Sequence, residues 1–234
     1  MNPRIGEPCQ TRPAAEVLAE KDIGVPPVGP LPDLSDPPHP PVLDPVVESL
    51  VRVAHPRIQL LECYRRAGWQ SAVPDCWLRR SVAERLGRVA DDLPERWGLA
   101  VFDGWRPFDL QVELYRAAYT DPNLPPGFFA EPDDDLLRPP PHLSGGAVDL
   151  TLTVDGIPLG PGTDFDDLTP LARVAALEHQ PGPNRDVRRF LNQVMASKGF
   201  VVFDGEWWHF EYGTRRWAAI TGGTPRFGPA GPAD

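Results

Sequence analysis

The sequence predicts an α+β fold, in which helices flank a central antiparallel sheet. Residues 146–154 alternate between apolar and polar side chains, which is typical of a strand. The Asp155-Gly156 pair that follows is a strong hairpin-turn signal. Residues 77–93 and 185–198 instead carry apolar side chains at helical spacing. Strands joined by tight turns, with helices between them, indicate this fold class.

Proline sets the first 50 residues apart from the rest of the chain. The sequence has 31 prolines among 234 residues, and runs such as Pro26-Pro27-Val28-Gly29-Pro30 lie in this segment. Proline stops helices and lacks a backbone donor, so we expect neither a helix nor sheet pairing here. We therefore divide the chain into a proline-rich extension that wraps the surface (1–48), a folded domain (49–220) and a flexible tail (221–234).

The first half of the folded domain is predicted to run helix, strand, helix and loop. The helix over 77–93 ends at Pro94, and Leu99 to Phe102 forms a short buried strand. A second amphipathic helix follows from the spacing of Phe108, Val112, Tyr115 and Tyr119. Residues 120–141 hold several prolines and consecutive aspartates, so they form a long loop, and loops of that length are often functional.

The second half contains the strand at 146–154, a further helix and a hairpin. We expect Asn184 to cap the helix over 185–198 and Gly199 to end it. Two strands follow, over 200–203 and 207–212, joined by an Asp-Gly turn.

Composition excludes several classes of protein. The chain has 23 basic and 33 acidic residues, for a net charge of −10. We expect no nucleic-acid partner, because a surface that follows phosphates needs clustered Lys and Arg. We expect no membrane partner either, because no apolar run approaches the ~18 residues of a membrane span. The 3 cysteines show no C-x-x-C spacing, and no signal-peptide core is apparent. A reduced, cytoplasmic protein is the simplest interpretation.

Two short segments carry the residues suited to chemistry. The first begins with His142 and ends with Asp149, and the second is Glu206-Trp207-Trp208-His209. Two imidazoles and a carboxylate suit Zn²⁺ with one coordination position left open. Glu206 is then a fourth group that need not be a ligand.

The predicted strands constrain how these groups can meet. Asp149 lies on the polar face of its strand, and the Gly145-Gly146 pair permits a sharp turn that brings His142 beside it. Glu206 and His209 are three positions apart, so on a regular strand they would face opposite sides. A bulge or the preceding Asp-Gly turn must therefore re-aim one of them.

The pattern H-x-x-G-x-A-x-D, followed downstream by E-W-W-H, resembles that of the VanX-type D-Ala-D-Ala dipeptidases. These are zinc peptidases related to D,D-carboxypeptidases and, more remotely, to the hedgehog signalling domain. Residues 102–107 resemble the D-G-x-R-P segment of this family, and residues 162–166 resemble its G-[ST]-x-F-D segment. The family's helix before the E-W-W-H strand is also matched, at Asn184-Arg185, Met195, Gly199 and Phe200. The likeness spans about residues 50–212.

The resemblance implies roles for six residues. It implies one Zn²⁺ per chain, held by His142, Asp149 and His209. Glu206 would be the general base, Arg106 would face the developing oxyanion, and Asp166 would contact the free amino group of a small dipeptide substrate. The reaction would be hydrolysis of D-alanyl-D-alanine or a close relative, which in this family serves peptidoglycan metabolism or dipeptide recycling.

One position departs from the family pattern, and two other functions compete with the dipeptidase. Pro140 stands where the family motif has serine, so a hydroxyl and a backbone N–H are missing there. A D,D-carboxypeptidase or endopeptidase acting on peptidoglycan peptides is the first alternative. A zinc-bearing binding module without turnover is the second, and Glu206 and Arg106 speak against it because a structural zinc needs neither.

The sequence does not determine the oligomeric state. If the extension only wraps the surface, deletion of residues 1–45 should leave the metal content intact.

Overall fold

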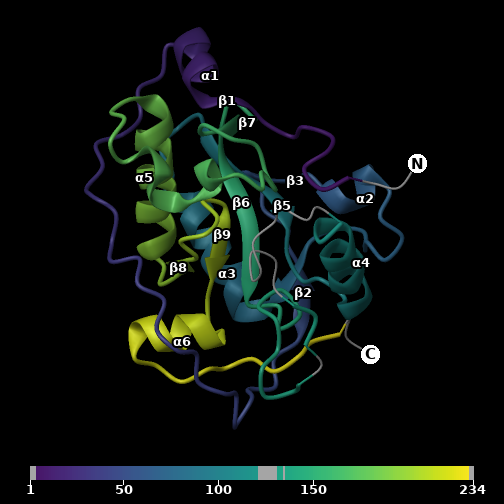
Figure 1. Cartoon of the computed structure of the whole chain (residues 1–234). Coiled ribbons are helices and arrows are strands. Elements are labelled where there is room, and N and C mark those ends of the chain that lie inside the picture. The colour runs from purple at the N-terminus through teal and green to yellow at the C-terminus, as the bar shows by residue number, and fades with distance from the viewer. Residues whose placement is uncertain (1–3, 121–130, 134, 232–234) are drawn as a thin grey trace.

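The computed structural model describes residues 4–120, 131–133 and 135–231. It confirms the predicted α+β fold (Figure 1). The central strand is β6 (Ala147–Val154), and β5 (Trp97–Asp103) pairs antiparallel with it along one side. On its other side, β6 pairs antiparallel first with β9 (His209–Glu211) and then with β7 (Ile157–Gly160). β6 is also buried along its whole length.

The outer strands extend this sheet in mixed directions. β3 runs parallel to β5 and β1 runs parallel to β7, whereas β8 is antiparallel to β9. The predicted antiparallel arrangement thus describes the centre of the sheet, and two outer pairs are parallel. A separate antiparallel pair joins β2 and β4. The bounds are β1 Arg12–Pro13, β2 Leu50–Arg52, β3 Ile58–Leu60, β4 Trp77–Arg79 and β8 Val201–Val202.

The three predicted helices are present, with changed details. The helix predicted over 77–93 begins later, as α3 (Arg80–Asp92), because β4 occupies its first residues. α4 (Phe108–Ala118) fully buries Leu110 and Leu114, whereas Tyr115 and Tyr119 of the predicted spacing are partly buried against the core. α5 (Pro183–Ala196) starts after Gly182 without a side-chain cap, so the capping role predicted for Asn184 is wrong. The shorter helices are α2 Cys63–Ala67, α6 Arg215–Thr221, η1 Pro170–Ala172 and η2 Val174–Leu177.

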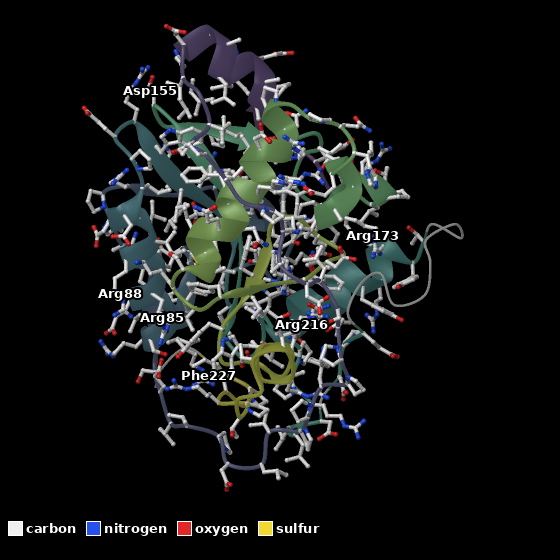
Figure 2. All side chains as sticks on the ribbon, turned by 90° about the vertical axis from the view of Figure 1, so that its left-hand side faces the viewer. Arg85, Arg88, Asp155, Arg173, Arg216 and Phe227 are labelled. Carbon is white, nitrogen blue, oxygen red and sulfur yellow. The ribbon has the colours of Figure 1, made fainter. Side chains whose placement is uncertain are left out.

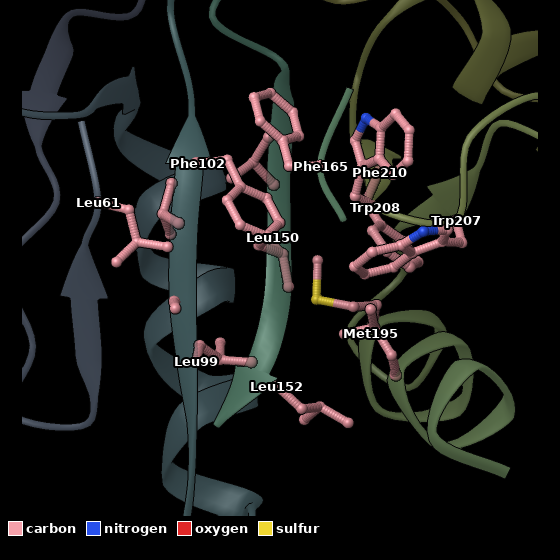
Figure 3. Packing of buried hydrophobic residues seen from close by; sticks show 14 of the residues in the cluster. Leu61, Leu99, Phe102, Leu150, Leu152, Phe165, Met195, Trp207, Trp208 and Phe210 are labelled. Carbon is pink, nitrogen blue, oxygen red and sulfur yellow. The ribbon is translucent and has the colours of Figure 1, made fainter. Parts of the chain in front are cut away.

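The main core lies between the sheet and α5 (Figure 3). Leu150 and Leu152 of β6 are fully buried, as is Met195 of α5. Trp207 and Trp208 pack edge to face with ring centroids 5.3 Å apart. Burying a leucine side chain contributes about 1.5–3 kcal/mol, so this layer fixes β6 firmly. Alternate residues of a strand face opposite sides, so Asp149 and the other residues that alternate with these leucines face away from this layer.

The N-terminal extension contains a helix, which the sequence analysis did not expect. α1 (Ala14–Lys21) follows Pro13 and buries Val17 and Leu18 in the main core. A helix fits because Pro13 precedes the first turn, where a missing N–H costs no hydrogen bond. The segment also pairs with the sheet through β1, so both parts of that prediction are wrong. After α1 the chain runs past α5 toward α6 without further regular structure up to β2, as a wrapping segment would (Figure 1).

The end of the chain is packed rather than loose over its described part. Phe227 is fully buried, beside α6 (Figure 2). The backbone N–H of Arg226 donates to the carbonyl of Gly213 at 2.8 Å, and that of Ala230 donates to Leu143 at 2.8 Å. Part of the segment that the sequence analysis set apart as a tail therefore packs against the folded domain. Within the residues described, no helix has the length and apolar character needed to cross a membrane.

Candidate metal centre and substrate cavity

Strand register aligns three polar residues across the centre of the sheet. Asp149 of β6 pairs directly with His209 of β9 on one side and with Asp103 of β5 on the other. The register of β5 shifts between Val101 and Asp103, and this bulge is what brings Asp103 opposite Asp149. Directly opposed side chains on neighbouring strands lie close together. Accordingly, Nδ1 of His209 lies 2.9 Å from Oδ1 of Asp149.

His142 reaches the same place from the turn that precedes β6. Gly145 has φ +71°, a left-handed conformation that suits glycine, and its N–H donates to the carbonyl of His142 at 3.0 Å. A Cβ on Gly145 would also lie 2.6 Å from Leu50. The sharp turn predicted from the Gly-Gly pair is thus present. It places Nε2 of His142 3.2 Å from Oδ2 of Asp149 and 3.2 Å from Nδ1 of His209.

The chemistry of these three side chains fits a divalent metal ion. The facing atoms of His142, Asp149 and His209 all lie within 4.8 Å of one another. The other ring nitrogens meet acceptors: Nδ1 of His142 is 2.7 Å from the carbonyl of Gly104, and Nε2 of His209 is 3.0 Å from Glu211. Carbonyls and carboxylates only accept, so with a metal ion bound, neutral rings would carry their protons there and turn their lone pairs toward the ion. Such orienting acceptors are typical of metal-ligating histidines.

The electrostatics of the centre favour positive charge. Burial opposes ionisation of Asp149, but His142 and His209 outweigh it and hold the pKa of Asp149 well below its usual range. Burial likewise opposes charge on His209, yet hydrogen bonds to Asp149 and Glu211 raise its pKa to about 10. A centre that attracts a proton in this way also attracts a metal cation.

Glu206 lies outside the strand that carries His209. β9 begins only at His209, and Glu206 belongs to a turn in which its N–H donates to Phe203 at 3.1 Å. The turn re-aims the side chain, as the spacing required, and Oε2 of Glu206 lies 3.8 Å from Nδ1 of His209. Burial raises the pKa of Glu206 above its usual range, more than the neighbouring His209 lowers it. Its carboxylate therefore has a stronger affinity for a proton than an exposed glutamate.

Arg106 is held beside the centre by side chains on several elements. Its Nε donates to Asp103 at 2.9 Å, its Nη1 to Gln111 at 2.9 Å and its Nη2 to the hydroxyl of Tyr64 at 3.2 Å. The same Nη2 lies 3.6 Å from Oδ2 of Asp149. A planar guanidinium held at several edges has a fixed orientation.

Asp166 sits on the far side of Tyr64 from Arg106. The Tyr64 hydroxyl donates to Oδ2 of Asp166 at 3.0 Å, so Tyr64 bridges the two charged groups. The backbone of Asp166 has φ +58°, which is uncommon for a residue other than glycine. Burial raises the pKa of Asp166 well above its usual range.

All six predicted site residues line one cavity of about 580 Å³. That volume lies within the about 300–1,000 Å³ typical of small-molecule sites. The wall also includes Pro140 and, from the two ends of the chain, His39, Arg215 and Arg216. The cavity therefore combines a group suited to a metal ion, a buried acid and a buried cation.

Comparison with known families gives a match over residues 74–220, more than half of the chain, to the family described as D-ala-D-ala dipeptidase. The chain belongs to this peptidase family. It is also similar to a D-alanyl-D-alanine dipeptidase of Synechocystis sp., with 30% identity over 177 residues. That alignment covers 60% of this chain and 71% of the relative. The resemblance seen in the sequence is thereby confirmed, and the N-terminal extension lies outside the family match.

Several residues of the site were missed by the sequence analysis. Asp103 stood within the recognised F-D-G-W-R-P segment but received no role. Glu211 follows His209 by two positions, and that spacing on a strand places both side chains on one face. Tyr64, Gln111 and Arg216 gave no local signal, because their roles depend on contacts between distant segments.

Proposed function

We propose that this peptidase is a zinc-dependent dipeptidase that hydrolyses D-alanyl-D-alanine or a closely related dipeptide. The observation that carries the proposal is the convergence of His142, Asp149 and His209 in a cavity that also contains Glu206 and Asp166. The family match and the Synechocystis relative support the choice of substrate.

His142, Asp149 and His209 would hold one Zn²⁺ per chain, because two imidazoles and a carboxylate are a typical donor set of catalytic zinc. Zinc bound there would polarise the scissile carbonyl and lower the pKa of a water molecule to about 7. The remaining steps rest on side chains of the protein itself.

Glu206 is the proposed general base. Its raised pKa and its position 3.8 Å from Nδ1 of His209 suit a group that takes a proton beside the metal centre. It would accept the proton of the attacking water and then give that proton to the leaving amine. A carboxylate with an ordinary pKa would hold the proton less readily for that second step.

Arg106 is the proposed donor to the carbonyl oxygen, on which negative charge develops during attack. Burial opposes its charge, but Tyr64 and Asp103 raise its pKa above the usual range, so it remains a cation. Because the side chain is already oriented by its hydrogen bonds, little reorganisation is needed as the charge forms.

Asp166 is the proposed anchor for the free amino group of the substrate. A buried carboxylate is costly when unpaired, and an incoming ammonium would supply its counter-ion. This anchor favours a dipeptide with a free N-terminus over a longer, blocked wall peptide.

Pro140 affects which dipeptide fits. It lines the cavity, and its carbonyl accepts from the N–H of Ser144 at 3.1 Å, so the position is committed to the turn. Since proline offers no donor, the substrate cannot receive a hydrogen bond from this residue.

The test is a panel of four substrates with protein assayed for bound metal. Release of free amine is followed from D-Ala-D-Ala, L-Ala-D-Ala, L-Ala-L-Ala and N-acetyl-D-Ala-D-Ala. We expect hydrolysis of free D-Ala-D-Ala and not of the acetylated form. Cleavage of the acetylated form would replace this proposal with a D,D-carboxypeptidase. Stoichiometric zinc without turnover of any substrate would support a binding module instead.

A further inference from the structure

A chain of contacts extends from His209 to the surface. Glu211, which is fully buried, accepts from Nε2 of His209 at 3.0 Å. The same Oε1 of Glu211 accepts a hydrogen bond from Nη1 of Arg216, while its Oε2 accepts from the hydroxyl of Thr214. Glu211 is therefore fixed from two sides, and it orients the ring of a proposed metal ligand.

The N-terminal extension contacts the guanidinium of Arg216 on the edge that faces away from Glu211. Nε lies 3.1 Å from Oδ1 of Asp36 and Nη2 lies 3.2 Å from Oδ2, which is a bidentate arrangement. The guanidinium also lies over the ring of Phe203, with 4.2 Å between its carbon and the ring centroid. Arg216 belongs to the first turn of α6 and is labelled in Figure 2. Asp36 and Arg216 are 180 positions apart in the sequence.

The part of the extension that carries Asp36 is anchored by other contacts. Nε and Nη2 of Arg215 donate to the carbonyls of Pro40 and His39, each at 2.9 Å. The N–H of Val42 donates to the carbonyl of Leu137 at 2.9 Å, and Val42 is buried. Asp36 is thus presented to Arg216 from a fixed stretch of chain rather than by a loose tail.

We propose that Asp36 and Arg216 are positioning residues of the metal centre, acting through Glu211 on His209. The inference rests on the metal site of the proposed function. Asp36 binds one edge of the guanidinium and leaves Nη1 to donate to Glu211. Only a planar cation with several donors can hydrogen-bond to both carboxylates at once. The extension is then part of the site, and its removal should weaken metal binding, contrary to the expectation from sequence.

The experiment compares Asp36→Asn with Asp33→Asn in the full-length chain. Asp33 lies in the same segment and, within the described part of the chain, accepts hydrogen bonds from Ser35 alone, so it controls for loss of one negative charge. Zinc affinity is measured by competition with a chromophoric chelator, and the visible spectrum is recorded with Co²⁺ in place of Zn²⁺. Loss of a residue that hydrogen-bonds directly to a metal-ligating side chain lowers metal affinity about 10- to 100-fold. Asp36 acts one contact further out, so we expect a decrease of about 3- to 10-fold and a shifted Co²⁺ spectrum for Asp36→Asn.

Arg216→Lys and the double variant show whether the effect passes through Arg216. Lysine keeps the charge but cannot bind two carboxylates in a fixed plane, so we expect weaker zinc binding and no further loss when Asp36→Asn is added. Wild-type affinity and spectrum in Asp36→Asn, or additive losses in the double variant, would overturn the proposal. The affinity readout needs no turnover, so a chain that binds zinc but leaves D-Ala-D-Ala intact would refute the dipeptidase and not this inference.

Discussion

Substitution of Glu206 by glutamine removes the proposed base while leaving the proposed ligands in place. The amide has nearly the same shape but cannot take a proton from water. The side chain lies 3.8 Å from His209, whereas the facing ligand atoms approach to 2.9–3.2 Å of one another, so the metal set should survive. A positioned general base contributes about 10²- to 10⁴-fold in rate. We therefore expect kcat for D-Ala-D-Ala to fall by about 10²- to 10⁴-fold with the zinc content unchanged.

The assay measures kcat and KM by amine release, together with zinc per chain, for Glu206→Gln and for a matched control. Glu178→Gln is suitable, since Glu178 pairs with Arg189 and is not among the residues that line the cavity. The control should retain wild-type kcat. A Glu206→Gln protein with full zinc and more than about a tenth of the wild-type kcat would refute the assignment, because that loss is too small for a lost base.

Three further predictions concern stability and binding. Asp166→Asn should raise KM for D-Ala-D-Ala, and because burial raises the pKa of Asp166, its folded form holds a proton that the unfolded form releases. The carboxylate therefore costs stability increasingly as the pH rises above its unfolded pKa. In urea titrations, the gain in stability of the variant over wild type should grow as the pH is raised above about 4; an equal gain at every pH would contradict this. Leu150→Ala should lower the free energy of unfolding by about 2–5 kcal/mol, because Leu150 is fully buried, and a loss below about 1 kcal/mol in urea would show that the core layer is less tight than described. Arg106→Lys should lower kcat about 10²- to 10³-fold with folding intact by circular dichroism, since lysine cannot contact Asp103 and Gln111 together and still reach the substrate; near-normal kcat would remove Arg106 from the oxyanion role.

Local patterns in the sequence predicted the elements that carry the site. The alternation over residues 146–154 identified β6, because a strand with one face in the core repeats every two residues. The glycine pair before it identified the turn that brings His142 to Asp149. Spacing also showed that Glu206 and His209 could not both lie on one regular strand, and the structure places Glu206 in a turn.

Local patterns failed where a residue's role comes from a distant partner. On α4, Leu110 and Leu114 are fully buried, whereas Tyr115 and Tyr119 of the predicted spacing are only partly buried, because neighbouring elements, and not periodicity alone, decide which face of a helix is covered. Proline content suggested an extension without structure, yet a short proline-free stretch was enough for α1 once the core could bury Val17 and Leu18.

The sequence by itself indicated which residues could do the chemistry: two histidines, an aspartate and a glutamate, in two motifs that resemble those of a peptidase family. Only the tertiary structure decided what holds them. Tyr64 hydrogen-bonds to both Arg106 and Asp166, and Asp36 accepts a hydrogen bond from Arg216, which is 180 positions away in the chain. Hydrogen bonds depend on distance in space, and no local pattern of residue types records which distant segments the fold brings within about 3 Å of each other.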